Sequence, residues 1–509
     1  VDSQVLKPNS WCSCLALSMS QTSNHAREVS DFQGRPLKHI AEEIWILLKI
    51  TVPMMFRLYI LCAFDRLTVA IVGHYDATPD HISGALLGKM YSNITGLSVG
   101  IGLALGISTL VSQNHGRGAD HENGKVLWQC IKVLTPAFIF SAAAALLSKP
   151  LLAAIGQPAG VLTPCQLFSS LQVLGLPPAW LSSALGNILV SQGVVGPNVV
   201  CDASASVLSL LLSYVFMRFC GTGYIGAALA TVISNWVQLV LYCVYVVGTG
   251  RQDGVWRVAR PSANDDHPEQ RSLRSASLKI FLRASLPSAF SMWAEWWAAE
   301  VLAVFAGWLP GAELSVGANG LLFNTLAVFY MTFVATATAT TTRVGNLVGM
   351  KDARRIPMSI GLAVALAAFL SGLVALVLQV WGPLILQLYT DETGIIREAT
   401  RANLGMVLSV PPYAMMMCLL GALRGAGLQM WGAVALFISF YLVGLPIGAF
   451  LGLRCDMDLL GIWLGNVISL SLSALGMGSR LCGVDWSWVV RKEAANAEAG
   501  AELVESLQG

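Results

Sequence analysis

Charged side chains are scarce in this chain of 509 residues, because Asp, Glu, Lys and Arg make up only 12% of it. Soluble domains carry about 25% charged residues. Hydrophobic residues make up 55% of the chain, so it has too little polar surface for a soluble fold of this size. The net charge of +2 gives no basis for nucleic-acid binding.

Short motifs of several enzyme and metal-binding classes are also missing. The sequence has no P-loop and no H-E-x-x-H zinc motif. The eleven cysteines show no zinc or disulfide spacing, and their one close pair is Cys12 and Cys14. The first 15 residues are too polar for a signal peptide. We therefore expect no enzyme activity, no bound metal and no cofactor.

Long apolar runs are what the sequence does contain. A helix needs roughly 20 apolar residues to cross a bilayer, and backbone groups in lipid must be satisfied within the segment. The first six runs lie at 46–72, 82–108, 125–147, 161–189, 197–218 and 224–248. The second six lie at 278–307, 315–341, 356–382, 396–421, 428–452 and 459–480. The pattern predicts an all-α integral membrane protein with twelve transmembrane helices.

Lys and Arg in the loops predict the orientation, since these residues are enriched in cytoplasmic loops. The richer set of loops includes the hydrophilic stretch from Arg251 to Arg274, and both polar tails belong to this set. We predict a cytoplasmic N-terminal tail at 1–45, an N-lobe at 46–249 and a cytoplasmic linker at 250–277. A C-lobe follows at 278–482, with a cytoplasmic C-terminal tail at 483–509.

An internal repeat relates the two sets of six runs. The pattern I-x-L-[KR]-x-[ST]-x-P-x-x-F occurs at 46–56 and again at 280–290, an offset of 234. The segments 108–116 and 341–349 match at an offset of 233, and 226–234 matches 461–469 at an offset of 235. Because six is even, both copies enter the membrane from the same side. We therefore predict two lobes related by a pseudo-twofold axis along the membrane normal, with a substrate site between or within them.

Two carboxyl groups fall inside the seventh run, where a charge costs at least ~2.5 kcal/mol. Glu295 is near the middle of the run and Glu300 is further toward its end. Five residues turn a helix by roughly 140°, so the two do not share one face. Loss of water around a carboxyl favours its protonated form, which could carry a proton, and its ionised form would attract a cation. Neighbouring tryptophans such as Trp296 offer aromatic faces to a cation, and these features suit an exchanger of protons and organic cations.

Other polar residues in the runs have two interpretations each. Asp65 and Arg66 could form a structural ion pair, or Asp65 could be a second proton site. Four further groups could contact a ligand or join neighbouring helices by hydrogen bonds: Asn93, Asn324, Tyr330 and Tyr413.

Several motifs give the chain a family resemblance. The most specific is Glu295-Trp296-Trp297-x-x-Glu300. The others are Val72-Gly73-His74, Thr109-Leu110-Val111-Ser112-Gln113-x-x-Gly116, Arg343-Val344-Gly345-Asn346-x-x-Gly349, Leu423-Arg424-Gly425-x-Gly427-x-Gln429 and Tyr441-x-x-Gly444-Leu445-Pro446. Across residues 46–480 the chain resembles the multidrug and toxic compound extrusion (MATE) family, in its eukaryotic branch.

The resemblance implies an efflux antiporter driven by protons or sodium ions, whose lobes alternate between inward- and outward-facing states. It implies roles in proton coupling and cation export for Glu295 and Glu300, and Asn324 matches the family's eighth-helix asparagine. The tenth helix departs from the family, because Tyr413 stands where an acidic residue is usual. The first helix has Thr68 where bacterial relatives often have an acid, and Asp65 could compensate for it.

The expected function is therefore secondary active efflux of small organic molecules, such as organic cations, drugs or secondary metabolites, in exchange for protons. The alternatives are another two-lobed carrier, such as a flippase of the wider superfamily, or an organic-anion exporter. We expect a monomer in the plasma membrane or the vacuolar membrane, with the lipid bilayer, protons and the substrate as its partners.

Overall fold

The structure is a computed structural model that describes all residues except 1–35, 76–78, 155, 257–267, 391 and 506–509. Within the described residues the secondary structure is entirely helical. Eleven helical stretches among them are long and apolar enough to cross a membrane. The helix α11 (Pro268–Ala306) has a similar length but carries Arg283, Glu295 and Glu300, and it supplies the twelfth span. The predicted twelve-helix fold is confirmed.

Each predicted run corresponds to one helix or to a chain of short helices. The N-terminal half consists of α2 (Pro36–Tyr75), α3 (Pro79–Ser92), η1 (Asn93–Leu97), α4 (Ser98–Gly116), η2 (Asp120–Glu122), α5 (Asn123–Leu146), α6 (Ser148–Ala154), α7 (Ala159–Gln172), η3 (Val173–Gly175), α8 (Leu176–Ser191), α9 (Gly196–Arg218), α10 (Tyr224–Gly248) and η4 (Arg251–Gly254). The C-terminal half consists of α11, α12 (Ala312–Gly349), α13 (Arg355–Gln387), α14 (Thr393–Gly425), α15 (Gln429–Phe437), η5 (Ile438–Gly444), α16 (Leu445–Arg454) and α17 (Asp458–Cys482).

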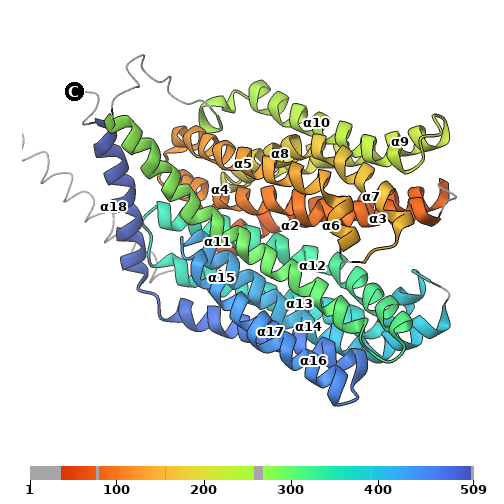
Figure 1. The fold of residues 1–509 in the computed structure, drawn as a ribbon. Coiled ribbons are helices and arrows are strands. Elements are labelled where there is room, and N and C mark those ends of the chain that lie inside the picture. Colours follow the sequence, from red (N-terminus) through yellow and green to blue (C-terminus); the bar gives the residue numbers. More distant parts are fainter. Residues whose placement is uncertain (1–35, 76–78, 155, 257–267, 391, 506–509) are drawn as a thin grey trace, which may run out of the picture.

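The two halves lie side by side as two helical bundles, α2 to α10 above and α11 to α17 below in Figure 1. A last helix, α18 (Trp486–Glu505), crosses the end of the bundle at which α10 ends and α11 begins. We call this the linker end. Helix α2 begins at Pro36 and α18 ends at Glu505, so both extend into the segments predicted as tails.

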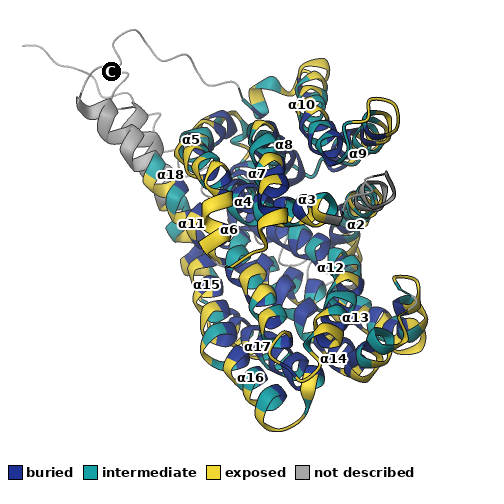
Figure 2. Cartoon of the chain, turned by 45° about the vertical axis from the view of Figure 1, so that its right-hand side comes forward, coloured by how far each residue is buried: buried dark blue, intermediate teal, exposed yellow. Residues whose placement is uncertain are grey.

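Exposed residues lie around the outside of the bundle (Figure 2), and many of them have large apolar side chains. Examples are Leu388 at 80% exposed and Leu475 at 70%. An apolar surface of this extent would be costly in water but is favourable in lipid. The burial pattern therefore agrees with a protein that crosses the membrane many times.

Small residues let the two halves approach closely at the linker end. A Cβ atom added to Gly116 of α4 would overlap the backbone oxygen of Asn346 of α12. One added to Gly349 of α12 would overlap the backbone oxygen of Gln113 of α4. Gly116 and Gly349 are equivalent positions of the repeat, as are Gln113 and Asn346, since both pairs differ by 233. Equivalent motifs of the two halves thus meet at one crossing, which we call the glycine crossing.

A buried ion pair joins the two halves at the same end. Arg343 of α12 donates from Nε to the carboxylate of Glu43 of α2 at 2.8 Å, and a second hydrogen bond runs from Nη2 to the other carboxylate oxygen. Both side chains are less than 10% exposed. Two parallel bonds of this kind fix the geometry of an arginine–carboxylate pair, so the start of α2 is held against the end of α12.

A G-x-S-x-G string occurs at Gly96 to Gly100 but lies within η1 and α4. The Ser98 hydroxyl is buried and donates to the Ile94 carbonyl at 2.8 Å. A nucleophile elbow needs an exposed serine on a strand-to-helix turn. This segment is instead a close helix contact, because a Cβ on Gly100 would overlap the Trp180 ring.

Candidate functional site

Glu295 lies in the second half of α11 and is half-buried. Its carboxylate accepts a hydrogen bond of 2.8 Å from the hydroxyl of Tyr413 of α14. On the adjacent residue, the Ala294 carbonyl accepts a hydrogen bond of 3.0 Å from Tyr441 of η5, which fixes this part of α11 against the C-terminal half. Glu295 is therefore an interior carboxyl group with a neutral phenol as its hydrogen-bond partner.

An aromatic cluster lies beside this carboxyl. Tyr330 of α12 stacks on Tyr413, with ring centroids 3.5 Å apart and planes within 7°. Phe333 meets the Tyr413 ring edge-on at 6.1 Å. The Tyr330 hydroxyl is 3.4 Å from the hydroxyl of Ser409. Aromatic rings attract cations over their faces, so the cluster and Glu295 together suit a positively charged organic group.

Arg424 adds a positive charge on the linker-end side of this cluster. It lies eleven residues after Tyr413 on α14, which is about three helical turns toward the linker end on the same face. Its charge acts on both Glu295 and Tyr413. Its Nε is buried and has no hydrogen-bond partner in the described residues. The surroundings of Glu295 therefore include a distant cation but no ion pair in direct contact.

The other two predicted residues of α11 lie elsewhere on the helix. Trp296 is 41% exposed, and Glu300 is exposed near the end of α11. The structure places neither beside Tyr330 and Tyr413. The prediction that Glu295 and Glu300 do not share a face agrees with this placement.

The predicted polar residues of the N-terminal half do not gather around Glu295. Asp65 is exposed and pairs with Lys89 at 2.6 Å. Of the two interpretations of Asp65, the ion pair with Arg66 is wrong, because Arg66 donates to the backbone oxygen of Asn324 at 2.9 Å and to the Cys62 sulfur at 3.1 Å. The role of Asp65 as a second proton site stays a prediction. Lys89 lies on α3, the next helix along the chain, and its position beside Asp65 depends on how α2 and α3 pack.

The two asparagines have structural surroundings of their own. The Asn324 amide donates to the Gly320 carbonyl of its own helix at 2.9 Å. Asn93 begins the π-helical segment η1 and is half-buried. Asn324 lies at the contact between α2 and α12, so it belongs to the surface between the two halves.

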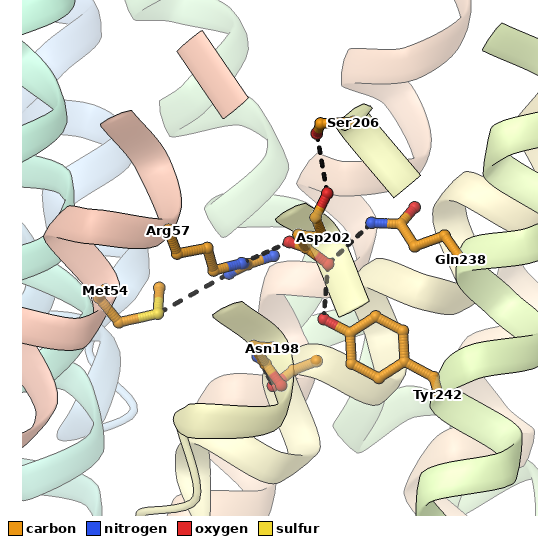
Figure 3. A network of polar contacts seen from close by, with 8 residues as sticks. Met54, Arg57, Asn198, Asp202, Ser206, Gln238 and Tyr242 are labelled. Carbon is orange, nitrogen blue, oxygen red and sulfur yellow. Dashed lines mark hydrogen bonds and ion pairs between the residues drawn. The ribbon is translucent and has the colours of Figure 1, made fainter. Parts of the chain in front are cut away.

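A second charged cluster lies inside the N-terminal half, and sequence reasoning missed it (Figure 3). Asp202 of α9 is 1% exposed and accepts a hydrogen bond of 2.5 Å from Arg57 Nε of α2. Its other oxygen accepts from Gln238 at 2.8 Å and from Tyr242 at 2.9 Å, both on α10. The sequence does indicate a special role for Asp202, because it is the one acidic residue in the predicted fifth run. We call these four residues the Asp202 network.

Metal binding has no support in the described residues, which contain no group of three His, Cys, Asp or Glu side chains able to hold an ion. Cys12 and Cys14, the one close cysteine pair, lie outside them. In the Asp202 network, the guanidinium of Arg57 already neutralises the carboxylate, so no free negative charge is left for a bound cation.

Comparisons with known proteins agree with this architecture. The chain is 27% identical to multidrug and toxin extrusion protein 1 of Danio rerio over 464 residues, covering 91% of this chain and 76% of the relative. It is 25% identical to Protein DETOXIFICATION 16 of Arabidopsis thaliana over 470 residues, covering 91% and 93%. The fold matches the crystal structure of the eukaryotic MATE transporter AtDTX14 with a TM-score of 0.81 at 23% identity, covering 91% and 99%.

The family model described as MatE matches the chain twice, at residues 53–215 and 287–450. The two matches start 234 residues apart, which is the offset of the internal repeat. Together they cover more than half of the sequence. The chain therefore belongs to the MATE family of multidrug and toxin extrusion transporters, and it is a multi-pass membrane protein.

Proposed function

We propose that this transporter exports organic cations in exchange for protons, and that Glu295 binds the proton and the cation in turn. The observation that carries the proposal is the half-buried carboxyl of Glu295, whose hydrogen bond comes from the neutral hydroxyl of Tyr413. A carboxylate paired with an arginine would stay ionised. A carboxyl paired with a phenol can be neutral or ionised, because its partner stays uncharged in both states.

The charge of Glu295 links the two transported species. When the carboxyl is protonated, it has no net attraction for a cation. When it is ionised in a poorly hydrated site, a cation beside it offsets the cost of burying the negative charge. A proton that arrives from the other side of the membrane displaces the cation, so the two exchange.

Aromatic residues make the site suitable for an organic cation. The stacked pair of Tyr330 and Tyr413 places ring surface beside the carboxyl. Attraction between a cation and a ring is worth about 2 kcal/mol when water is excluded. Quaternary ammonium groups, which cannot donate hydrogen bonds, benefit most from such a site.

The contact between the two halves supports alternating access. The glycine crossing and the pair of Glu43 with Arg343 hold the linker end together. A substrate could pass this end only after both contacts separate. We propose that the linker end faces the cytoplasm, with both chain termini, in the plasma membrane or a vacuolar membrane.

The first test is cation flux in proteoliposomes with an imposed pH gradient. We expect wild type to exchange tetraethylammonium for protons, and Glu295→Gln to lose the flux driven by the pH gradient while keeping its thermal stability. Glu42→Gln is the matched control, since Glu42 is an exposed carboxylate at the start of α2. Equal flux in wild type and E295Q would refute the proposed role, and a sodium gradient that replaces the pH gradient would refute proton coupling.

Export of organic anions is less well supported, because an anion site needs a cation that is free to pair with the substrate. Arg57 and Arg343 are already bonded to Asp202 and Glu43. Arg424 is the exception, but its charge acts on the acidic Glu295. The same flux experiment with an organic-anion substrate would detect this activity.

A further inference from the structure

The outer surface of the C-terminal half carries three basic side chains close to the linker end. Lys279 and Arg283 are exposed and lie four residues apart on α11, so they share one face of that helix. Arg480 lies in the last turn of α17. The start of α15 lies between them, since α15 packs against both α11 and α17 (Figure 1). We call Lys279, Arg283 and Arg480, together with Trp431 of α15, the basic surface.

Arg480 is placed by the packing of α17 against α15. A Cβ atom added to Gly476 of α17 would lie 3.9 Å from the Cβ of Ala435 of α15. One helical turn nearer the linker end on each helix, the Arg480 guanidinium lies over the Trp431 ring, 4.9 Å from its centroid. A guanidinium that stacks on a ring still presents the N–H groups of its edge to a phosphate or carboxylate. Trp431 is 53% exposed, so the pair lies at the surface of the bundle.

Arg283 is placed by the packing of α11 against α15. Its backbone carbonyl accepts a hydrogen bond of 3.3 Å from Nε2 of Gln429, in the first turn of α15. About two turns further along both helices, the rings of Phe290 and Phe437 are 6.0 Å apart. Phe290 follows Arg283 by seven residues and therefore lies on the same face of α11. This face is thus basic near the linker end and apolar further into the membrane.

No acidic side chain of the described residues neutralises the basic surface. Lys279 and Arg283 take part in no ion pair there. The Arg480 side chain donates no hydrogen bond to a described residue, and its Nε is shielded from solvent. Asp485, which follows Arg480 by five residues, pairs with Arg491 instead. The five donors of the Arg480 guanidinium therefore lack an acceptor in the described part of the protein.

Exposed apolar side chains continue from the basic surface toward the middle of the membrane. They include Leu286 and Phe290 of α11, Val434 and Phe437 of α15, and Leu472 and Leu475 of α17. In a bilayer, acyl chains cover apolar surface at this depth. A phospholipid fits both parts, because its acyl chains cover the apolar side chains and its phosphate accepts charge-assisted hydrogen bonds from a guanidinium.

We propose that the basic surface is a binding site for an anionic phospholipid of the leaflet at the linker end. The phosphate accepts hydrogen bonds from Arg480, whose guanidinium is held in position by the Trp431 ring. Lys279 and Arg283 attract the negative headgroup, and the acyl chains lie along α11, α15 and α17. A zwitterionic phospholipid has the same phosphate, but the three cations repel its ammonium group. This leaflet is the cytoplasmic one in the orientation proposed above, and cytoplasmic leaflets carry the anionic lipids.

Diffuse attraction between anionic lipids and basic loops makes a different prediction from a site. Each exposed Lys or Arg at the linker end would then contribute about fivefold to lipid affinity, wherever it lies. Arg354 provides the comparison, because it is an exposed arginine directly before α13. Helix α13 packs against α12 and α14, away from the basic surface.

The experiment measures lipid binding to the full chain in detergent micelles through the thermal midpoint of unfolding. Phosphatidylglycerol, phosphatidylcholine and inorganic phosphate are titrated in separate arms. We expect phosphatidylglycerol to stabilise wild type at a concentration about fivefold or more below that needed for phosphatidylcholine. Equal stabilisation by phosphatidylcholine would overturn the preference for an anionic lipid. Equal stabilisation by inorganic phosphate would overturn a lipid site, since acyl chains would then contribute nothing.

Variants separate a site from diffuse attraction. We expect Arg480→Gln and Arg283→Gln each to raise the phosphatidylglycerol concentration for half-maximal stabilisation by about fivefold or more. The matched control Arg354→Gln should stay close to the wild-type value. Each variant is compared with itself before lipid is added, and the two test variants lie on different helices, so one poorly folded variant leaves the other as a test. Equal shifts in all three variants, or no shift in R480Q and R283Q, would overturn the proposal.

This inference and the proposed function can fail separately, because lipid binding is measured without substrate or gradient. A protein that binds phosphatidylglycerol at the basic surface but shows no proton-driven cation flux would refute only the function. Proton-driven flux in a protein that does not distinguish the two lipids would refute only the lipid site.

Discussion

At the scale of single residues, the partner of each interior carboxylate decides what it can do. Glu295 is bonded to a phenol, whereas Asp202 and Glu43 are bonded to guanidinium groups. The first arrangement tolerates a change of charge and the other two do not. We therefore expect these three carboxylates to have different roles, and the difference lies in side chains far away in the sequence.

The Asp202 network makes a stability prediction at this scale. Asp202→Asn keeps the shape of the side chain but leaves Arg57 buried without a counter-charge, so we expect a loss of about 3 kcal/mol in the free energy of unfolding. Unfolding in mixed micelles would measure it. The double variant Arg57→Gln with Asp202→Asn should recover most of the loss, and a double variant less stable than D202N would contradict this account.

How far the sequence predicts the site also depends on single residues. Glu295 could be predicted because a charge in an apolar run is conspicuous. Its partner Tyr413 is 118 residues away, and no periodicity in either helix indicates that the two meet. Lys89, which pairs with Asp65, belongs to another helix, so only helix packing could show that it competes with Arg66.

At the scale of helices, contacts between α2 and α12 hold the two halves together over much of their length. Tyr59 and Thr332 share a hydrogen bond of 2.7 Å, and Arg66 bonds to the Asn324 backbone nearer the opposite end. At the linker end, α2 and α12 are joined by Glu43 and Arg343. Opening that end requires the end of α12 to separate from both α2 and α4.

The ion pair between α2 and α12 predicts a change in conformational balance. Glu43→Gln leaves one partner of a buried pair alone, which favours states in which Arg343 reaches water. We expect faster thiol labelling of Val348→Cys, a buried position of α12 near the glycine crossing, in a background without other reactive cysteines. The exchanged pair Glu43→Arg with Arg343→Glu should restore slow labelling. An unchanged labelling rate in E43Q would contradict the view that this ion pair holds the linker end closed.

The helices themselves could be predicted better than their contacts. Apolar runs of span length predicted α2, α5, α9 and α10 because lipid requires internally satisfied backbone. The glycine crossing could not be predicted from the apolar runs. The repeat shows that Gly116 and Gly349 are equivalent, but only the packed structure shows that they meet.

At the scale of the whole molecule, the proposed exchange of one monovalent cation for one proton at Glu295 predicts an electroneutral cycle. One monovalent cation leaves for each proton that enters, so no net charge crosses the membrane. A potassium diffusion potential set with valinomycin should therefore leave the rate of tetraethylammonium exchange unchanged at a fixed pH gradient. A rate that rises with one sign of the potential and falls with the other would contradict a single-carboxylate exchange.

The two-lobe plan was the most predictable property of the molecule, because a nearly constant offset of 233 to 235 residues required two similar halves. The family model matches both halves in equivalent places. The offset does not reveal how the halves differ. The arginine of the Asp202 network and the phenol beside Glu295 are local departures from the repeat, which the offset alone does not predict.

The Asp202 network has a consequence for how the ancestral duplication has been used. A gene copied in tandem begins with two equal lobes, each able to evolve a proton-binding group. In this protein Arg57 already neutralises Asp202 in the first lobe, so that carboxylate is not available for proton exchange. On the proposed mechanism, the two copies of one duplicated unit then have different tasks, one as the scaffold and the other as the exchanger.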